Sequence, residues 1–295
     1  MRPSRAHHHP RGAALLLVLW LIALLAALVG AFALTSRTEQ LQGRVLHRGA
    51  VAAEAARAGL EYAVARVVDP AADTRWQADG RDYAWRFHDA ELVLNIVDEA
   101  GKVDLNTAAP ELLAGLLRAL GVEEAEAGAL AAAIVDWRDI DDLGQPQGAA
   151  EDPQYASAGL PYGAKDAPFE DLAELQQVLG MPPATYAALL PHVTVYSAMP
   201  TPDPRYAGAP VLQALGIDPE PVLAQRQPQA GMPAPVAVPG GGSGTYSIDS
   251  HARLADGRVA TLRAVVRTGG GAPGSAYTPL FWKEGVSVSE PQPRP

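Results

Sequence analysis

The chain has 295 residues, no cysteine and a formal net charge of −10. Its length suits about two domains of roughly 150 residues each, and its 48% apolar and 19% charged residues are typical of a folded protein. The lack of cysteine excludes disulfides, zinc–thiolate sites and thiol nucleophiles. The acidic balance disfavours nucleic acid as the main partner, because phosphate binding needs a basic surface.

The N-terminus joins a basic segment to a long apolar one. Residues 1–12 contain three arginines and three histidines but no acid, and residues 13–36 contain no charged side chain. About 20 apolar residues suffice for a helix to cross a bilayer. The positive flank predicts that residues 1–12 stay cytoplasmic and that the chain after Arg37 lies on the far side of the membrane.

Three interpretations of this segment are open from the residues alone. Ala31-Phe32-Ala33 has the small residues of a secretory cleavage site, which would release a soluble protein, such as a secreted hydrolase, that begins at Leu34. The second interpretation is a plain signal anchor. The third is cleavage on the cytoplasmic side after Gly12, which would leave the apolar helix in a mature chain that begins at Ala13.

The apolar segment is predicted to continue as an amphipathic helix. Residues 38–68 contain no proline, and Asp69-Pro70 ends the helical pattern, since the residue before proline is pushed out of the helical region. The pattern predicts one helix from Ala13 to Val68, with two helices broken near Gly43 or Gly49 as the alternative. Apolar residues recur at helical steps in its last turns: Ala53, Ala56, Leu60, Val64 and Val67.

A basic leader that ends in glycine, followed by a long helix that changes from apolar to amphipathic, resembles the type IV pilin and type II secretion pseudopilin superfamily. The resemblance implies that a prepilin peptidase cuts between Gly12 and Ala13. Most members carry glutamate at the fifth mature position, where this chain has Leu17, and that departure is typical of the minor pseudopilin K. The residues that the resemblance places in membrane anchoring and assembly are Leu17, Trp20, Leu21, Leu24 and Leu28.

Two hairpins are predicted on either side of a helical region. Residues 83–87 and 91–97 alternate as short strands, and Asp256-Gly257 is a favoured hairpin turn between residues 245–254 and 259–268. We expect the second hairpin to pair with the first, so that the helical region is an insertion. The sequence therefore predicts an α+β fold, with a pilin-like N-terminal helix and a small antiparallel sheet. Phe281-Trp282 is an apolar spot that is expected to pack on this head, with contact to a partner as the alternative.

The helical region between the hairpins is predicted to contain helices at 107–120, 125–137, 173–179 and 183–190, with Thr107 as the first N-cap. Residues 209–216 repeat the pattern of 109–121 in degenerate form. These units resemble helix-hairpin-helix (SAM-like) modules, which implies an alternative function as a membrane-anchored DNA-binding protein. The turn after Gly121 carries three acids, however, and these would repel phosphate.

An acidic loop over residues 136–155 concentrates carboxylates in a segment rich in glycine and proline. Six carboxylates lie between Asp136 and Asp152. Calcium binds carboxylate and carbonyl oxygens, so the loop is a candidate calcium site. A solvated acidic loop is the alternative.

Several motifs in this order resemble the general secretion pathway protein K family: Asp136-Trp137-Arg138-Asp139, Glu151-Asp152 with Tyr155, Pro161-Tyr162, Lys165 and Pro168-Phe169. The resemblance implies a large helical domain inserted into a pilin-like head, with calcium bound in its loop. Its ligand candidates are Asp139, Asp141, Glu151 and Asp152. Asp136 and Asp142 are weaker candidates, because Asp136 could instead brace the end of its helix.

The function that this resemblance implies is assembly rather than catalysis. The chain would be a minor pseudopilin at the tip of the periplasmic pseudopilus of a type II secretion system. It would be anchored in the inner membrane by one span, with its C-terminal domain in the periplasm. The implied partners are the I- and J-type minor pseudopilins, the major pseudopilin and the prepilin peptidase, and no nucleic acid.

The domain organisation expected from these patterns has six parts. They are a leader over 1–12, a transmembrane segment over 13–36, an amphipathic helix and first strands over 37–103, an inserted helical domain over 104–228, a Pro/Gly linker over 229–244, and a C-terminal hairpin and tail over 245–295.

Overall fold

The computed structural model describes residues 11–141, 143–145, 150–226, 242–269 and 275–288, which form an α+β structure. The chain divides into two units, residues 1–51 and residues 52–295. Helix α1 (Arg11–Val67) begins in the first unit and ends in the second, which confirms the single continuous helix expected from the sequence.

The first unit contains the apolar part of α1. The 18-residue window Leu15–Phe32 has a mean hydropathy of 2.9 and is long and apolar enough to cross a membrane. The side chains predicted for anchoring and assembly are all exposed, from Leu21 at 56% to Trp20 at 75%. An apolar helix with this much exposed surface needs a non-aqueous environment or partner helices.

In the second unit, the last turns of α1 pack on one face of a sheet. Ala56, Leu60 and Val64 are at most 1% exposed, and they follow the helical spacing that the sequence shows. Gly59 permits close approach to the sheet, since a Cβ atom there would lie 2.5 Å from Ser250 Oγ and 2.6–2.7 Å from two leucine methyl groups. Helix and sheet therefore share a buried core.

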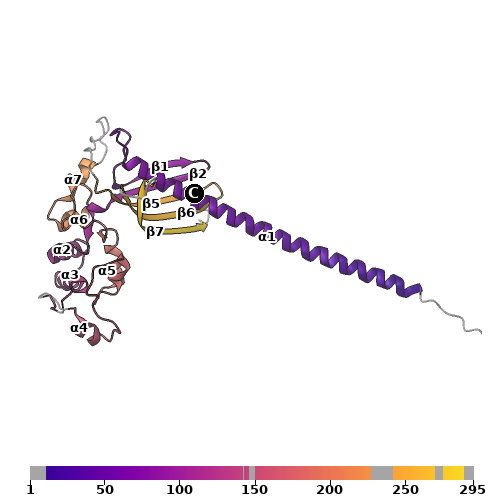
Figure 1. Ribbon diagram of the computed structural model, residues 1–295, viewed down its shortest axis with the longest axis horizontal. Coiled ribbons are helices and arrows are strands. Elements are labelled where there is room, and N and C mark those ends of the chain that lie inside the picture. Colours follow the sequence, from indigo (N-terminus) through magenta and orange to yellow (C-terminus); the bar gives the residue numbers. More distant parts are fainter. Residues whose placement is uncertain (1–10, 142, 146–149, 227–241, 270–274, 289–295) are drawn as a thin grey trace, which may run out of the picture. The chain divides into compact units, whose positions relative to one another are not determined.

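The sheet is antiparallel and has five strands in the order β1-β2-β5-β6-β7 (Figure 1). The predicted pairing of the two hairpins is confirmed, because β2 pairs with β5 from Ala90↔Leu254 to Asp98↔Tyr246. The helical region is thus inserted between two strands that are neighbours in the sheet. The strands are β1 (Asp79–Phe87), β2 (Ala90–Asp98), β5 (Thr245–Leu254), β6 (Arg258–Thr268) and β7 (Tyr277–Val288).

Strand β7 was not predicted from the sequence, where its residues stood out only as an apolar spot. Pro279 and a register irregularity in the β6–β7 ladder interrupt the strand pattern. The aromatic residue Trp282 of β7 faces α1: it lies under Arg57, 5.3 Å from guanidinium carbon to ring centroid. Packing on the head, the role expected for Trp282, is what the structure shows.

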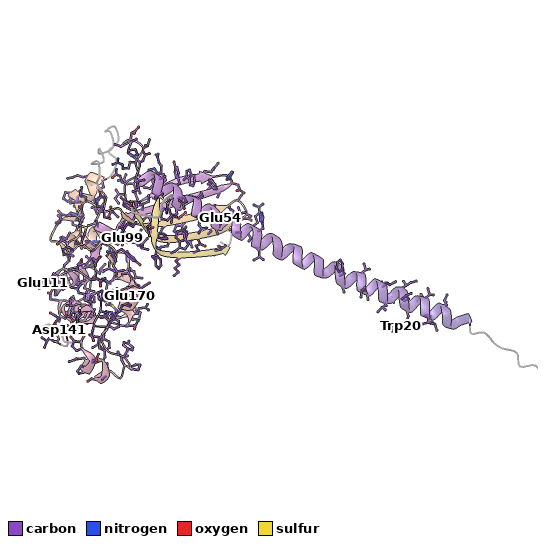
Figure 2. The ribbon with its side chains drawn as sticks, viewed as in Figure 1. Trp20, Glu54, Glu99, Glu111, Asp141 and Glu170 are labelled. Carbon is purple, nitrogen blue, oxygen red and sulfur yellow. The ribbon has the colours of Figure 1, made fainter. Side chains whose placement is uncertain are left out.

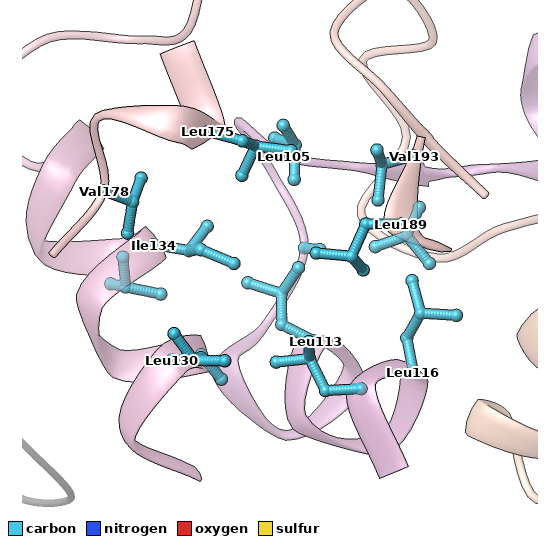
Figure 3. Close-up of a cluster of buried hydrophobic side chains, with 14 of the residues drawn as sticks. Leu105, Leu113, Leu116, Leu130, Ile134, Leu175, Val178, Leu189 and Val193 are labelled. Carbon is cyan, nitrogen blue, oxygen red and sulfur yellow. The ribbon is translucent and has the colours of Figure 1, made fainter. Parts of the chain in front are cut away.

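The helical region is a group of short elements at one end of the sheet (Figure 1). Its core is formed by leucine, isoleucine and valine side chains from α2, α3, η2, α5 and the β3–β4 pair (Figure 3). The short turn η1 (Glu99–Gly101) leads from β2 into this region. The elements of the region are β3 (Val103–Asp104), α2 (Pro110–Ala119), α3 (Glu124–Arg138), α4 (Asp152–Ser157), η2 (Leu172–Gln176), α5 (Pro183–Leu189), β4 (Val193–Thr194), α6 (Ala209–Ala214) and α7 (Pro219–Arg226).

Two local predictions were wrong. Thr107 is not the N-cap of α2: the cap is Ala109, with Pro110 as the first helical residue, because Thr107 and Ala108 already turn back to the Asp104 carbonyl. Residues 173–179 do not form an α-helix: the chain forms the 3₁₀ turn η2 there, which ends at Gln176.

Candidate metal centre

Three carboxylates meet where α3 ends and α4 begins. Asp136 lies in the last turn of α3, Asp139 is the C-cap of that helix, and Glu151 is the N-cap of α4. One oxygen of each side chain can be chosen so that all three lie within 4.8 Å of one another. Asp136, Asp139 and Glu151 together form an acidic triad.

Asp136 is fully buried and ties down the loop between the two helices. Its Oδ1 accepts from the Gln145 N–H at 3.1 Å and its Oδ2 from the Ala150 N–H at 2.7 Å. Burial raises the pKa of Asp136, although the two backbone hydrogen bonds oppose that shift. Each oxygen keeps one further lone pair, which could be given to a cation.

Asp139 contributes an acceptor that the protein leaves unused. Its Oδ1 is buried and has no hydrogen-bond partner among the residues that the structure describes. Burial raises the pKa of Asp139, and the negative charges of Asp136 and Asp141 raise it further. Both features are costs that a bound cation would remove, since a positive charge supplies the missing partner and stabilises the ionised form.

The donor set suits a hard cation. The acidic triad offers oxygen ligands only, and two oxygens on opposite sides of a calcium ion at about 2.4 Å lie about 4.8 Å apart. The acidic triad could therefore hold a metal ion, although its residues do not identify which one.

The structure brings only some of the predicted ligands together. Asp139 and Glu151 lie in the acidic triad, and Asp136, the weaker candidate, joins them. Asp141 is exposed and its Oδ1 accepts from the Leu143 N–H at 2.9 Å. Asp152 is exposed outside the acidic triad. Asp142 lies outside the described residues.

The role of Asp136 had a signal in the sequence. Asp136 and Asp139 are three residues apart at the end of a predicted helix, so they share one face of it. The distance from this face to Glu151 had no such signal, because no local sequence pattern fixes the separation of residues that lie on different helices.

The start of the acidic loop is fixed to the rest of the helical region. Arg138 donates to the carbonyl of Leu105 and, at 2.7 Å, to that of Ala108. Trp137 Nε1 donates to Glu174 at 3.3 Å, and Lys165 Nζ donates to both carboxylate oxygens of Glu174 at 2.9–3.0 Å. These hydrogen bonds hold the end of α3, which carries Asp136 and Asp139, against the rest of the helical region.

The turn before α3 is built differently from a phosphate-binding hairpin. The Glu123 carboxylate accepts from the N–H groups of Ala125 and Glu126 at 2.9 and 3.3 Å. These first-turn amides are the donors that a phosphate would need. A carboxylate of the chain already occupies them, so this turn does not favour a nucleic-acid backbone.

Comparison with known proteins finds similarity to one family. A family model described as type II secretion system, protein K, matches residues 92–198, which contain α2 to α5 and the whole acidic triad. Two curated relatives carry the same description, type II secretion system protein K. One, from Pectobacterium carotovorum subsp. carotovorum, is 28% identical, with 62% of each chain covered. The other, from Klebsiella pneumoniae, is 31% identical, with 63% of each chain covered.

Over residues 92–198 the chain is similar to the type II secretion system protein K family. It spans slightly less than two thirds of the length of these two protein K relatives.

A solved structure supports the fold. The match is to a chain of the GspK-GspI-GspJ complex from the type 2 secretion system of enterotoxigenic Escherichia coli, with a TM-score of 0.60 and 17% sequence identity. The match covers 83% of this chain and 100% of the other. At this identity the likeness shows the α+β fold.

Proposed function

We propose that this chain is a minor pseudopilin at the tip of the periplasmic pseudopilus of a type II secretion system, where it supports protein export across the outer membrane. One observation carries the proposal: the helix that packs on the antiparallel sheet begins with a window apolar enough to cross a membrane. The similarity of residues 92–198 to the protein K family supports the same role. The role is structural and needs no catalytic site.

The proposed architecture is a pilin-like head interrupted by a helix-hairpin-helix (SAM-like) domain. The head is formed by the end of α1 and the five strands, and the inserted domain by residues 104–228. The contact of α2 with α6 supports the internal repeat. Gly115 of α2 lies against Ala214 of α6, so closely that a Cβ atom added to Gly115 would lie 3.2 Å from the Ala214 carbonyl oxygen.

The proposed processing and assembly follow the pseudopilin pattern. A prepilin peptidase cuts between Gly12 and Ala13, at the start of α1, and the helix stays in the inner membrane with the head in the periplasm. Leu17, in place of the usual glutamate, agrees with a subunit that has no subunit above it. The solved complex unites GspK with GspI and GspJ, so the proposed partners are the I- and J-type minor pseudopilins, together with the major pseudopilin.

N-terminal sequencing of the membrane-bound protein tests the proposal. In a host with a prepilin peptidase we expect a mature chain that begins at Ala13, and we expect this cleavage to disappear when the peptidase is deleted. Gly12→Val should abolish the cut, whereas the matched change Ala33→Val should leave it intact. A chain that begins at Leu34 in the soluble fraction would overturn the proposal and favour a secreted protein.

We further propose that the cation of the acidic triad is calcium. Three carboxylates at one point suit its preference for oxygen ligands, and its flexible geometry accepts waters and backbone carbonyls in the remaining positions. Asp141 and Asp152 remain candidates for such additional contacts. The proposed role of the ion is to hold α3, the loop and the start of α4 together.

Calcium titration tests this assignment. Calcium at about 100 times its dissociation constant should stabilise the fold by about 2.7 kcal/mol, measured as a rise in the melting temperature that chelation reverses. Asp139→Asn should remove most of the rise, and Asp166→Asn, an exposed change of equal charge in the same region, should not. An equal rise in wild type and Asp139→Asn would show that calcium binds elsewhere. Asp152→Asn measures whether that residue contributes.

DNA binding is the weaker alternative. The Glu123 carboxylate occupies the amides of the turn that would bind phosphate. Retention of the purified protein on duplex DNA at moderate salt would favour this alternative.

A further inference from the structure

A buried charged cluster lies where the helical region joins the sheet. Glu99 is 1% exposed, and Lys102 Nζ lies 2.5 Å from its Oε1. The other Glu99 oxygen accepts from the Thr194 hydroxyl of β4, and the first also accepts from the Ser247 hydroxyl of β5. Glu99 therefore joins three parts of the chain that are far apart in sequence: η1, β4 and β5. Figure 2 shows Glu99 at this boundary.

The cluster contains a serine–lysine pair, but its hydrogen bonds have the wrong direction for catalysis. Lys102 Nζ donates to Ser247 Oγ at 2.8 Å, whereas the Ser247 hydroxyl donates its proton to Glu99. A general base must accept the proton of the nucleophile. Here lysine donates to the hydroxyl oxygen, so the cluster serves to connect elements.

Thr194 is the point where the helical region enters this cluster. β4 pairs with β3, which directly follows η1: the Leu105 N–H donates to the Thr194 carbonyl at 2.9 Å. The Thr194 hydroxyl also accepts from the Tyr196 N–H at 3.0 Å. A movement of the β3–β4 pair relative to the sheet would therefore have to break the bonds to Glu99.

Other contacts between the helical region and the sheet side of this boundary are isolated hydrogen bonds or close backbone approaches. The Asp203 N–H donates to the Ala100 carbonyl at 2.7 Å, and Arg81 of β1 donates to the carbonyl of Arg226 at 2.6 Å. Gly101 lies against the backbone of Tyr206, leaving no room for a Cβ atom. Of these contacts, only the Glu99 cluster brings together a buried carboxylate, an ammonium group and two hydroxyls.

We propose that the Glu99 cluster is a lock that holds the helical region and the sheet as one rigid body. Without it, the helical region pivots on residues 102–104, where the chain passes from η1 into β3. A buried carboxylate that satisfies three donors fixes one geometry, because any other leaves charged or polar groups unpaired in the interior. The proposal does not depend on the secretion role or on a bound cation.

Distance measurements between two spin labels test the lock. The chain has no cysteine, so Ala84→Cys on β1 and Ala187→Cys on α5, both exposed, give unique labelling sites on the full-length protein in detergent. Pulsed electron resonance then yields the distribution of distances between sheet and helical region. We expect one narrow maximum for the otherwise unaltered chain.

Two lysine variants distinguish a specific effect of the Glu99 cluster from a general loss of stability. Lys102→Met removes the ammonium group of the cluster, and Lys165→Met removes an equivalent lysine that pairs with Glu174 inside the helical region. We expect Lys102→Met to broaden the distribution and Lys165→Met to leave it narrow. If both broaden it equally, or if neither does, the proposal is wrong.

Milder variants cover the case in which Lys102→Met does not fold. Ser247→Ala and Thr194→Val each remove one hydroxyl donor to Glu99 and keep the ion pair. Each should broaden the distribution less than Lys102→Met does, and the double variant should broaden it more than either single one. Folded variants with an unchanged narrow distribution would overturn the lock.

Discussion

Individual glycines of this protein have opposite energetic roles that depend on what lies beside them. Gly59 lies where α1 meets the sheet, and an added Cβ would collide with Ser250, Leu92 and Leu94. Gly128 of α3 has nothing within 4 Å of the corresponding position. Helix propensity alone favours alanine at both positions. At Gly59, contact with the sheet therefore outweighs helix propensity in setting the effect of an alanine substitution on stability.

Gly59→Ala should lower the free energy of unfolding by about 1–3 kcal/mol, which is the usual cost of overpacking a core. Gly128→Ala is the matched control and should raise it by about 0.5–1 kcal/mol. Denaturant unfolding followed by circular dichroism measures both. A gain in stability from Gly59→Ala would show that α1 does not approach the sheet this closely.

Residue patterns predicted the candidate metal site only in part. Asp139 and Glu151 were predicted from their order among neighbouring motifs, and the structure places both in the acidic triad. Asp136 was ranked lower because a helix-bracing role explains it equally well. The structure shows that bracing, through Gln145 and Ala150, together with its place in the triad. Residue types do not reveal that one side chain has both contacts.

Among the short elements, η2 depends on one glutamate for its position. Glu174 accepts from Lys165, from Trp137 and from the N–H groups of Glu170 and Asp171. Burial alone would raise the pKa of Glu174, but these donors outweigh burial and hold the pKa below its ordinary value of 4.5. The ionised form of Glu174 is therefore linked to the folded state.

The pH dependence of stability follows from the direction of that shift. A lowered pKa in the folded state stabilises the protein above the unfolded-state pKa, and the stabilisation is lost as pH falls through the folded-state pKa. Glu174→Gln should therefore destabilise the protein at neutral pH and show a smaller loss of stability on acidification below pH about 4.5.

Melting temperatures of Glu174→Gln across the acid range measure this effect. Glu126→Gln, an exposed change of the same charge, is the control and should follow the wild-type profile. A variant whose profile parallels that of the wild type throughout would contradict the link between Glu174 and acid stability.

The elements that the sequence predicted well are those with long local patterns. The continuous α1 and the Asp-Gly hairpin depend on periodicity and turn chemistry that a single sequence shows directly. Strand β7 and the 3₁₀ form of η2 depend on partners elsewhere in the chain. β7 contains Pro279 and Gly285 and is defined mainly by its pairing with β6, which no local pattern encodes.

For the molecule as a whole, the interrupted sheet was the most informative prediction. Two hairpins separated by a helical segment leave unpaired strand edges unless the hairpins meet, and unpaired edges are unfavourable in a soluble head. The sequence predicted that the two hairpins pair, and the β2–β5 ladder confirms it. The joint around Glu99 was not predicted, because it combines residues from η1, β4 and β5.

The place of the insertion also affects how the protein reaches its folded state. Glu99 and Ser247, which meet at the β2–β5 boundary, are 148 positions apart in the chain. Contacts of such sequence separation form slowly, because a long loop must close before they gain energy. The contacts of α2 with α3 are local and can form first. During synthesis, the backbone edge of β2 that pairs with β5 stays unpaired until the last strands are made. The nascent chain therefore exposes an aggregation-prone edge, for which chaperone protection is most valuable.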